Sequence, residues 1–144
     1  MQSQFIEQVI IISERYRVAI RSAINASELG IGAIHIRSLA VIAKSPACTA
    51  NFIVSELARD KAQVARIVKE LVSANLIQKC AHADDKRSQI LSLTKNGQSL
   101  MNKMHTTKAK INEQITQGLT PAQICQFEET ARLIADNLQP KVND

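Results

Sequence analysis

The chain has 144 residues, of which 45% are hydrophobic and 22% are charged, and its formal net charge is +5. This length suits one domain with a sizeable core, and the composition is not that of a disordered chain. Glycine and proline number only 4 and 3, and aromatic residues make up 3%. These counts disfavour β-sandwiches and barrels, which need many turns and strand-forming aromatics. We therefore predict a single, mostly α-helical domain over residues 1–144.

The apolar segments and the cysteines of the sequence indicate the cellular compartment of the protein. The chain has no run of about 20 apolar residues, the length that a membrane helix needs. Its N-terminal apolar run is interrupted by Glu7 and Gln8 and lacks a basic lead, so it does not read as a signal peptide. We predict a cytoplasmic protein with no membrane partner. An odd, scattered set of cysteines predicts no disulfide framework: Cys48, Cys80 and Cys125.

The positive charge is concentrated in the middle of the chain. Residues 59–110 hold eleven Lys and Arg against four Asp and Glu, a net of +7. Residues 1–58 carry +1 and residues 111–144 carry −3. A basic segment of this kind either binds an anionic partner or forms an ordinary solvated face. The predicted secondary structure of the segment distinguishes between the two interpretations.

The first two predicted elements are helices. Apolar residues recur every three or four positions from Phe5 to Ile24, which predicts a long amphipathic helix. Ile6, Ile10 and Ile11 widen its apolar stripe, so we expect burial on two sides, one of them against a second subunit. A shorter helix is predicted over Ile34–Lys44, ended by Ser45-Pro46.

A helix–turn–helix is predicted next. A short helix over residues 53–58 is followed by a turn at Arg59, and then by a helix over residues 61–74 with Asp60 as its N-cap. Asn75 suits a left-handed helix end. The apolar residues of the second helix predict its buried stripe: Val64, Ile67, Val68, Leu71 and Val72.

A charged hairpin and two helices complete the chain. Residues 76–82 and 89–93 read as two strands around a polar tip. Thr94 is predicted to cap a helix that runs to about Gln117, and Thr120-Pro121 to begin a last helix that ends at Leu138. This order predicts a winged helix–turn–helix, mostly α with a small β-hairpin wing, flanked by long helices.

Such a motif places its second helix in the major groove of DNA. We therefore expect base-edge and phosphate contacts from the exposed face of that helix, although an ordinary solvated face remains the alternative. The predicted contacts are Lys61, Ala62, Gln63 and Arg66. Four further lysines are expected to contact DNA phosphates: Lys69, Lys79, Lys86 and Lys95. Such contacts increase the affinity for DNA but do not discriminate between sequences.

Four segments together resemble the multiple-antibiotic-resistance regulator (MarR) family. They are Glu56-Leu57-Ala58, residues 60–66 (DKAQVAR), residues 71–77 (LVSANLI) and residues 85–97 (DKRSQILSLTKNG). They follow a family pattern of the form ELA, V-x-R-x-V-x-x-L, GLI, D-x-R and LT-x-x-G, and they cover residues 53–97. Asn75 stands where the family usually has glycine, and Gly32-Ala33 replaces a Thr/Ser-rich helix start.

The resemblance implies a homodimer that binds palindromic operators in double-stranded DNA. It implies a winged lobe at residues 33–97 and a helical dimerisation region formed by residues 1–30 and 98–144. It also implies that Arg87 enters the minor groove and that Asp85 orients it by a salt bridge. Tyr16, His35 and Arg37 are candidates to line an effector pocket between these two regions, although structural packing or an ordinary surface position is the stronger alternative for them.

A metal or redox site is the alternative role for the cysteines. Cys80 and His82 fall on one face of the predicted strand. A metal would need more ligands from distant positions, and none shows ligand spacing: His35, Cys48, His105 and Cys125. The family's peroxide sensors carry a cysteine in the first helix, and this chain has none there.

The sequence thus predicts a sequence-specific transcriptional repressor released by a small molecule. The alternative is a winged-helix module that binds protein, or binds DNA only architecturally. We expect neither enzymatic activity nor a cofactor, because the sequence shows no catalytic set, phosphate loop or metal motif.

Overall fold

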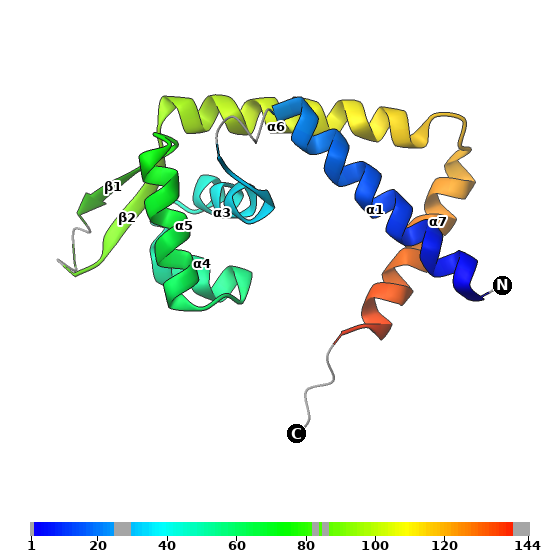
Figure 1. Ribbon diagram of the computed structural model, residues 1–144, viewed down its shortest axis with the longest axis horizontal. Helices are drawn as coiled ribbons and strands as arrows, with labels where there is room; N and C mark the ends of the chain where they lie inside the picture. Colours follow the sequence, from blue (N-terminus) through cyan, green and yellow to red (C-terminus); the bar gives the residue numbers. More distant parts are fainter. Residues whose placement is uncertain (1, 25–29, 82–83, 85–86, 140–144) are drawn as a thin grey trace, which may run out of the picture. The chain divides into compact units, whose positions relative to one another are not determined.

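The computed structural model describes residues 2–24, 30–81, 84 and 87–139. The elements follow one another in this order (Figure 1): α1 (Gln2–Ile24), α3 (Ala33–Lys44), α4 (Ala50–Leu57), α5 (Lys61–Ser73), β1 (Ile77–Ala81), β2 (Gln89–Leu93), α6 (Lys95–Thr116) and α7 (Pro121–Asn137). The chain forms two compact units, Met1–Lys108 and Ala109–Asp144, with the boundary inside α6. The predicted mostly α fold with a small hairpin is confirmed.

None of the described helices combines the length and the hydrophobicity that crossing a membrane would require.

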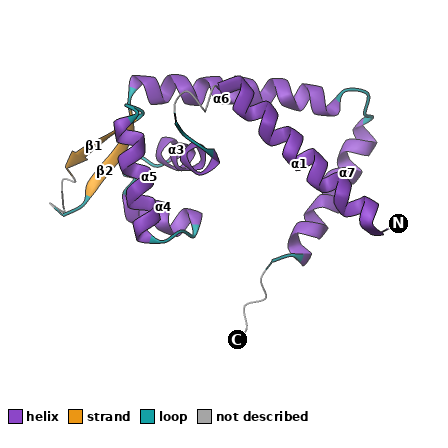
Figure 2. Cartoon of the chain, viewed as in Figure 1, coloured by secondary structure: helices purple, strands orange, loops and turns teal. Residues whose placement is uncertain are grey.

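The core of the first unit lies among α3, α4, α5 and the hairpin. These helices pack on one another, and the hairpin of β1 and β2 contacts α3 and α5 (Figure 2). Leu39, Ile53 and Leu71 are fully buried at its centre. The cluster also draws on the start of α6 through Leu100 and Met104. The predicted core residues of α5 lie in it: Val64, Ile67, Val68 and Leu71.

Val72 is the one residue of the predicted stripe that lies outside the core. It is 38% exposed, although its neighbour Leu71 is fully buried. One residue further along a helix is a rotation of about 100°, which turns Val72 away from the packed side. The prediction that it is buried was wrong.

The helix–turn–helix is fixed by caps at both helices. Asp60 accepts a hydrogen bond from the Gln63 backbone N–H at 2.7 Å, as predicted for an N-cap. Thr49 caps α4 by accepting from the Phe52 N–H at 3.2 Å, so this helix begins at Ala50, earlier than the sequence predicted. Asn75 ends α5 with φ +58°, the left-handed conformation that the sequence predicted for it.

The hairpin is antiparallel, with Ile77 opposite Leu93 and Ala81 opposite Gln89. It is tied to the helices by the Leu91 N–H, which donates to the Cys48 carbonyl at 2.7 Å. The connection before α4 therefore forms a bridge to β2 that the sequence did not predict.

Thr94 joins the end of α5 to the start of α6. Its hydroxyl donates to the Asn75 carbonyl at 2.6 Å and accepts from the Gly97 N–H at 3.1 Å. Its own backbone N–H donates to the Leu76 carbonyl at 3.1 Å. These bonds fix where the long helix leaves the winged lobe, and they confirm Thr94 as a helix cap.

The second unit consists of the C-terminal part of α6 and α7. Gly118 has φ +79° in the turn between them. Thr120 and Gln123 form the predicted capping box at the start of α7. The described part of α7 contains no buried residue, and its large apolar side chains are exposed; Phe127 is 60% and Leu133 65% exposed.

The burial of Cys48 leads to a first testable prediction. The side chain is fully buried, and burial raises the pKa of the Cys48 thiol. The thiol therefore stays protonated at neutral pH and reacts poorly with alkylating reagents. With N-ethylmaleimide at neutral pH, peptide mass spectrometry should find the exposed Cys80 and Cys125 modified and Cys48 protected until denaturant is added. Modification of Cys48 at the rate of Cys125 in the native protein would contradict the packing described here.

Candidate nucleic-acid interface

The exposed face of α5 carries the predicted DNA-contacting residues. Lys61, Ala62, Arg66 and Lys69 are all exposed, and Gln63 is half-buried beside its cap. Ala62, Arg66 and Lys69 recur at helical spacing, opposite the side that packs in the core. The helix therefore presents a short basic face with one small residue near its start, where a nucleic-acid surface can approach closely.

The hairpin supplies a second basic element beside α5. Lys79 on β1 is exposed, and so are the described tip residues Asp84 and Arg87. β1 contacts α5 directly. Two residues predicted for the wing, Asp85 and Lys86, lie outside the described residues, so the predicted pairing of Asp85 with Arg87 stays a prediction.

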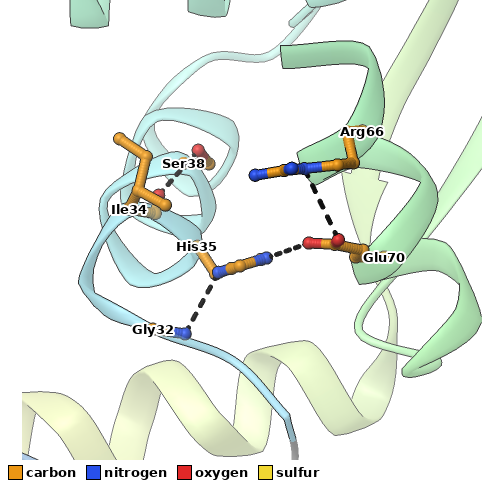
Figure 3. Close-up of polar contacts among 6 residues, drawn as sticks. All are labelled: Gly32, Ile34, His35, Ser38, Arg66 and Glu70. Carbon is orange, nitrogen blue, oxygen red and sulfur yellow. Dashed lines mark hydrogen bonds and ion pairs between the residues drawn. The ribbon is translucent and has the colours of Figure 1, made fainter. Parts of the chain in front are cut away.

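A polar chain links α3 to the exposed face of α5 (Figure 3). His35 Nε2 lies 2.6 Å from Glu70 Oε2. On the other side of the ring, Nδ1 accepts a hydrogen bond from the Gly32 backbone N–H at 3.0 Å. Glu70 Oε1 in turn lies 3.7 Å from Arg66 Nε, one helical turn away. The Arg66 guanidinium is thus connected, through a carboxylate and an imidazole, to the start of α3.

A cavity of about 200 Å³ lies within the first unit, between α1, α3 and α6. Its apolar wall is formed by Ile20, Ala33, Ile36 and Met104, and its polar lining is Tyr16, Gly32, Arg17, Arg21, Arg37 and Lys108. All four charged residues are basic. Two of the three predicted effector residues, Tyr16 and Arg37, therefore line one cavity. His35 does not line it and points to Glu70 instead.

Comparison with known proteins agrees with this arrangement. The sequence profile of the MarR family matches residues 29–88. The chain is 24% identical over 119 residues to the HTH-type transcriptional regulator BilQ of Clostridium symbiosum (strain WAL-14163), which covers 83% of this chain and 81% of the relative. The chain is thus similar to MarR family regulators over the segment that holds its helix–turn–helix.

Solved structures of MarR family regulators share its fold. A mutant MarR from E. coli in complex with operator DNA superposes with a TM-score of 0.70 at 19% identity, over 89% of this chain and 91% of that one. BpsR from Bordetella bronchiseptica, whose DNA binding is regulated by 6-hydroxynicotinic acid, gives a TM-score of 0.68 at 22% identity, over 90% and 91% of the two chains. The chain therefore has the winged helix–turn–helix fold that the order of its elements predicts.

Some residues of the candidate site were not found by sequence reasoning. Glu70 and its link to His35 join positions 35 residues apart, and no local pattern signals such a pair. The spacing of four between Arg66 and Glu70 is a local signal that the sequence did contain. The cavity residues Arg17 and Arg21 also recur one turn apart on α1, but nothing in the sequence shows that α3 and α6 complete their site.

No site formed by several metal-binding side chains is found in the described part of the chain. Among its His, Cys, Asp and Glu residues, no three gather as metal ligands would. Cys80 stands opposite Ile90 in the hairpin, and His82, its proposed companion, lies outside the described residues. The metal role considered for the cysteines therefore has no support among the described residues.

Proposed function

We propose that this protein is a homodimeric, sequence-specific DNA-binding repressor that a small organic anion releases from its operator. The observation that carries the proposal is the pairing, in one unit of this chain, of a basic exposed face on α5 with a basic-lined cavity beside α3. As a DNA-bound regulator it would act in the cytoplasm.

The DNA-binding part of the proposal rests on the placement of charge. Residues 59–110, which include α5 and the hairpin, carry a net charge of +7. Lys61, Gln63 and Arg66 stand in the first half of the second helix of the motif, the part that meets base edges in helix–turn–helix proteins. A basic face of this kind also binds any DNA through its phosphates, so the binding constant should fall steeply with salt.

The dimer is supported by apolar surface that the single chain leaves uncovered. Phe5, Ile6, Val9 and Ile10 on α1 are each about half exposed, and so are large apolar residues of the second unit. A monomer rarely exposes this much apolar surface. A two-fold dimer would bury it and would set two copies of α5 about 34 Å apart, the distance between successive major grooves.

Selection from a pool of random duplex DNA tests this function. The pool is enriched on the protein in the presence of excess competitor DNA, and the selected sequences are compared. An inverted repeat with half-sites one helical turn apart is the expected result. Recovery of unrelated sequences, with affinity set by salt alone, would instead support the architectural alternative, and no DNA binding would support a protein-interaction module.

The cavity lining predicts the chemical class of the effector. Four basic side chains around an apolar wall suit a compact aromatic carboxylate, which its cation partners hold by charge-assisted hydrogen bonds. Such a ligand would tie α1 to α3. If α1 belongs to the dimer interface, the ligand fixes the angle of the winged lobe and favours a dimer whose two α5 helices are wrongly spaced for DNA.

We expect benzoate to bind and the isosteric neutral benzamide not to bind. Arg37→Gln should weaken benzoate binding by roughly 10- to 150-fold, because a charge-assisted hydrogen bond is worth roughly 1.5–3 kcal/mol. Isothermal titration calorimetry measures both ligands. Lys103→Gln is the matched control, since it removes the same charge from an exposed position of α6 outside the cavity lining. Equal binding of the acid and the amide, or an equal loss in both variants, would rule out recognition of the anion by this cavity.

A further inference from the structure

Glu70 is the only acidic residue in α5, and it stands beside the basic face that is proposed to meet DNA. A carboxylate in this place repels phosphates, so it lowers the affinity for DNA of any sequence. It is also not an ordinary surface acid. Both of its oxygens are engaged, one by His35 and the other by Arg66 (Figure 3).

The hydrogen bonds around His35 define its tautomer. Nδ1 accepts from the Gly32 N–H, so this nitrogen carries no proton in the arrangement described. The proton of the neutral ring is therefore on Nε2, which donates to Glu70 Oε2. The His35 side chain is only 12% exposed, whereas Glu70 is 44% exposed. A mostly buried ring, bound to the backbone of the α3 N-terminus, thus fixes the position of a half-exposed carboxylate.

The contact between Glu70 and Arg66 is made at Nε, so the terminal Nη groups of the arginine can still bind a base. The carboxylate contacts the arginine at Nε, 3.7 Å away. The terminal groups form the fork that a guanine edge accepts through O6 and N7. An exposed ion pair of this length contributes little stability by itself. The Arg66 side chain is 72% exposed, so few other contacts hold it in place. The ion pair with Glu70, which His35 holds in position, restricts the orientation of the guanidinium.

We propose that Glu70 is a specificity-determining positioning residue, held by His35, that orients Arg66 for bidentate contact with one base. The inference rests on the proposed function, since it concerns how the α5 face reads an operator. It assigns Glu70 a role that lowers affinity for DNA in general and raises discrimination between sequences.

The test uses the full-length protein and the duplex selected by the wild type. Each position of a half-site is changed in turn, and binding is measured by fluorescence anisotropy. Glu70→Gln should reduce the preference at one base pair of each half-site by roughly 5- to 100-fold, the range for loss of one bidentate contact. Binding to unrelated DNA should be unchanged or stronger, because a negative charge has been removed. Glu56→Gln removes the same charge from an exposed position of α4, and it should leave every base preference as it was.

Two further sets of variants test the individual links. Arg66→Lys keeps the charge but not the fork, so it should lose the same preference, and combining it with Glu70→Gln should add little. His35→Gln can still donate toward Glu70 from the position of Nε2 and should retain most of the preference. His35→Asn keeps an acceptor for the Gly32 N–H but does not reach Glu70, and it should behave like Glu70→Gln.

The possible results separate this inference from the proposed function. Selective binding by the wild type with unchanged base preference in Glu70→Gln would overturn the inference alone. An equal loss of affinity for every sequence would also overturn it, because that result indicates a purely structural role. Failure of the wild type to select any sequence would overturn both. Thermal unfolding followed by circular dichroism shows whether each variant folds, and if Glu70→Gln does not, His35→Asn decides the question.

Discussion

Replacing Gly97 with alanine should lower the free energy of unfolding by about 3 kcal/mol, at the upper end of the usual cost of overpacking. A Cβ at this position would overlap the Leu76 carbonyl oxygen, and the Leu76 carbonyl carbon would lie only 3.0 Å away. These neighbours are backbone atoms, so a side-chain movement cannot relieve the overlap. The same carbonyl accepts the Thr94 N–H, and moving it would disturb the junction between α5 and α6.

Urea unfolding followed by circular dichroism measures this effect. Gly32→Ala is the matched control, because a Cβ there meets only His35 Nδ1, at 3.9 Å, and the backbone at φ −123° suits any residue. The control should change the free energy of unfolding by less than about 1 kcal/mol. Equal stability of the Gly97→Ala variant and the wild type would show that α6 does not approach Leu76 as described.

Replacing Arg87 with alanine should weaken operator binding by about 1–3 kcal/mol, up to roughly 100-fold. Arg87 is exposed at the hairpin tip, where the family resemblance places the residue that enters the minor groove. A narrow minor groove attracts arginine through its negative potential, so preference for A·T-rich DNA flanking the half-sites should decline as well. Arg87→Lys keeps the charge and should recover only part of the affinity.

Gel-shift titrations at two salt concentrations measure the loss. The control is Arg132→Ala, which removes an equal charge from an exposed position of α7 outside the winged lobe. Neither the affinity nor the flanking preference should change in that control. If the two alanine variants bound the operator equally well, the hairpin would have no part in DNA binding.

Local features of this fold were predictable because short-range chemistry decides them. Asp60 caps α5, Asn75 ends it in the left-handed conformation, and Thr120 begins α7, as their residue types predict. The hairpin was visible from two β-prone runs around a polar tip, and β2 has the predicted bounds, Gln89–Leu93. In each case one residue type satisfies backbone groups a few positions away.

Long-range contacts were not predictable in the same way. The Cys48 bridge to Leu91 and the bond from His35 to Glu70 join segments more than 30 residues apart, and no periodicity signals them. The Gly97 position shows an intermediate case. The LT-x-x-G pattern was recognised as part of a family resemblance, while its physical reason, contact with the Leu76 backbone, emerges only once the hairpin and α6 are placed.

The candidate site also combines features that local sequence predicts with features that depend on long-range packing. The sequence identified the basic face of α5, because helical spacing alone puts Arg66 and Lys69 on the side away from the core. It grouped Tyr16, His35 and Arg37 as candidates for one pocket. Tyr16 and Arg37 line one cavity, whereas His35 contacts Glu70 instead. Only packing between helices decides which polar residues share a cavity.

The most direct test of the proposed function is the stoichiometry of the complex with the selected duplex. Sedimentation equilibrium of the protein, alone and with that duplex, measures the number of chains in each species. We predict a dimer at micromolar concentration and two chains on one inverted repeat, with no stable complex of one chain on a single half-site. A monomer in solution that binds half-sites independently, one chain at a time, would contradict the account.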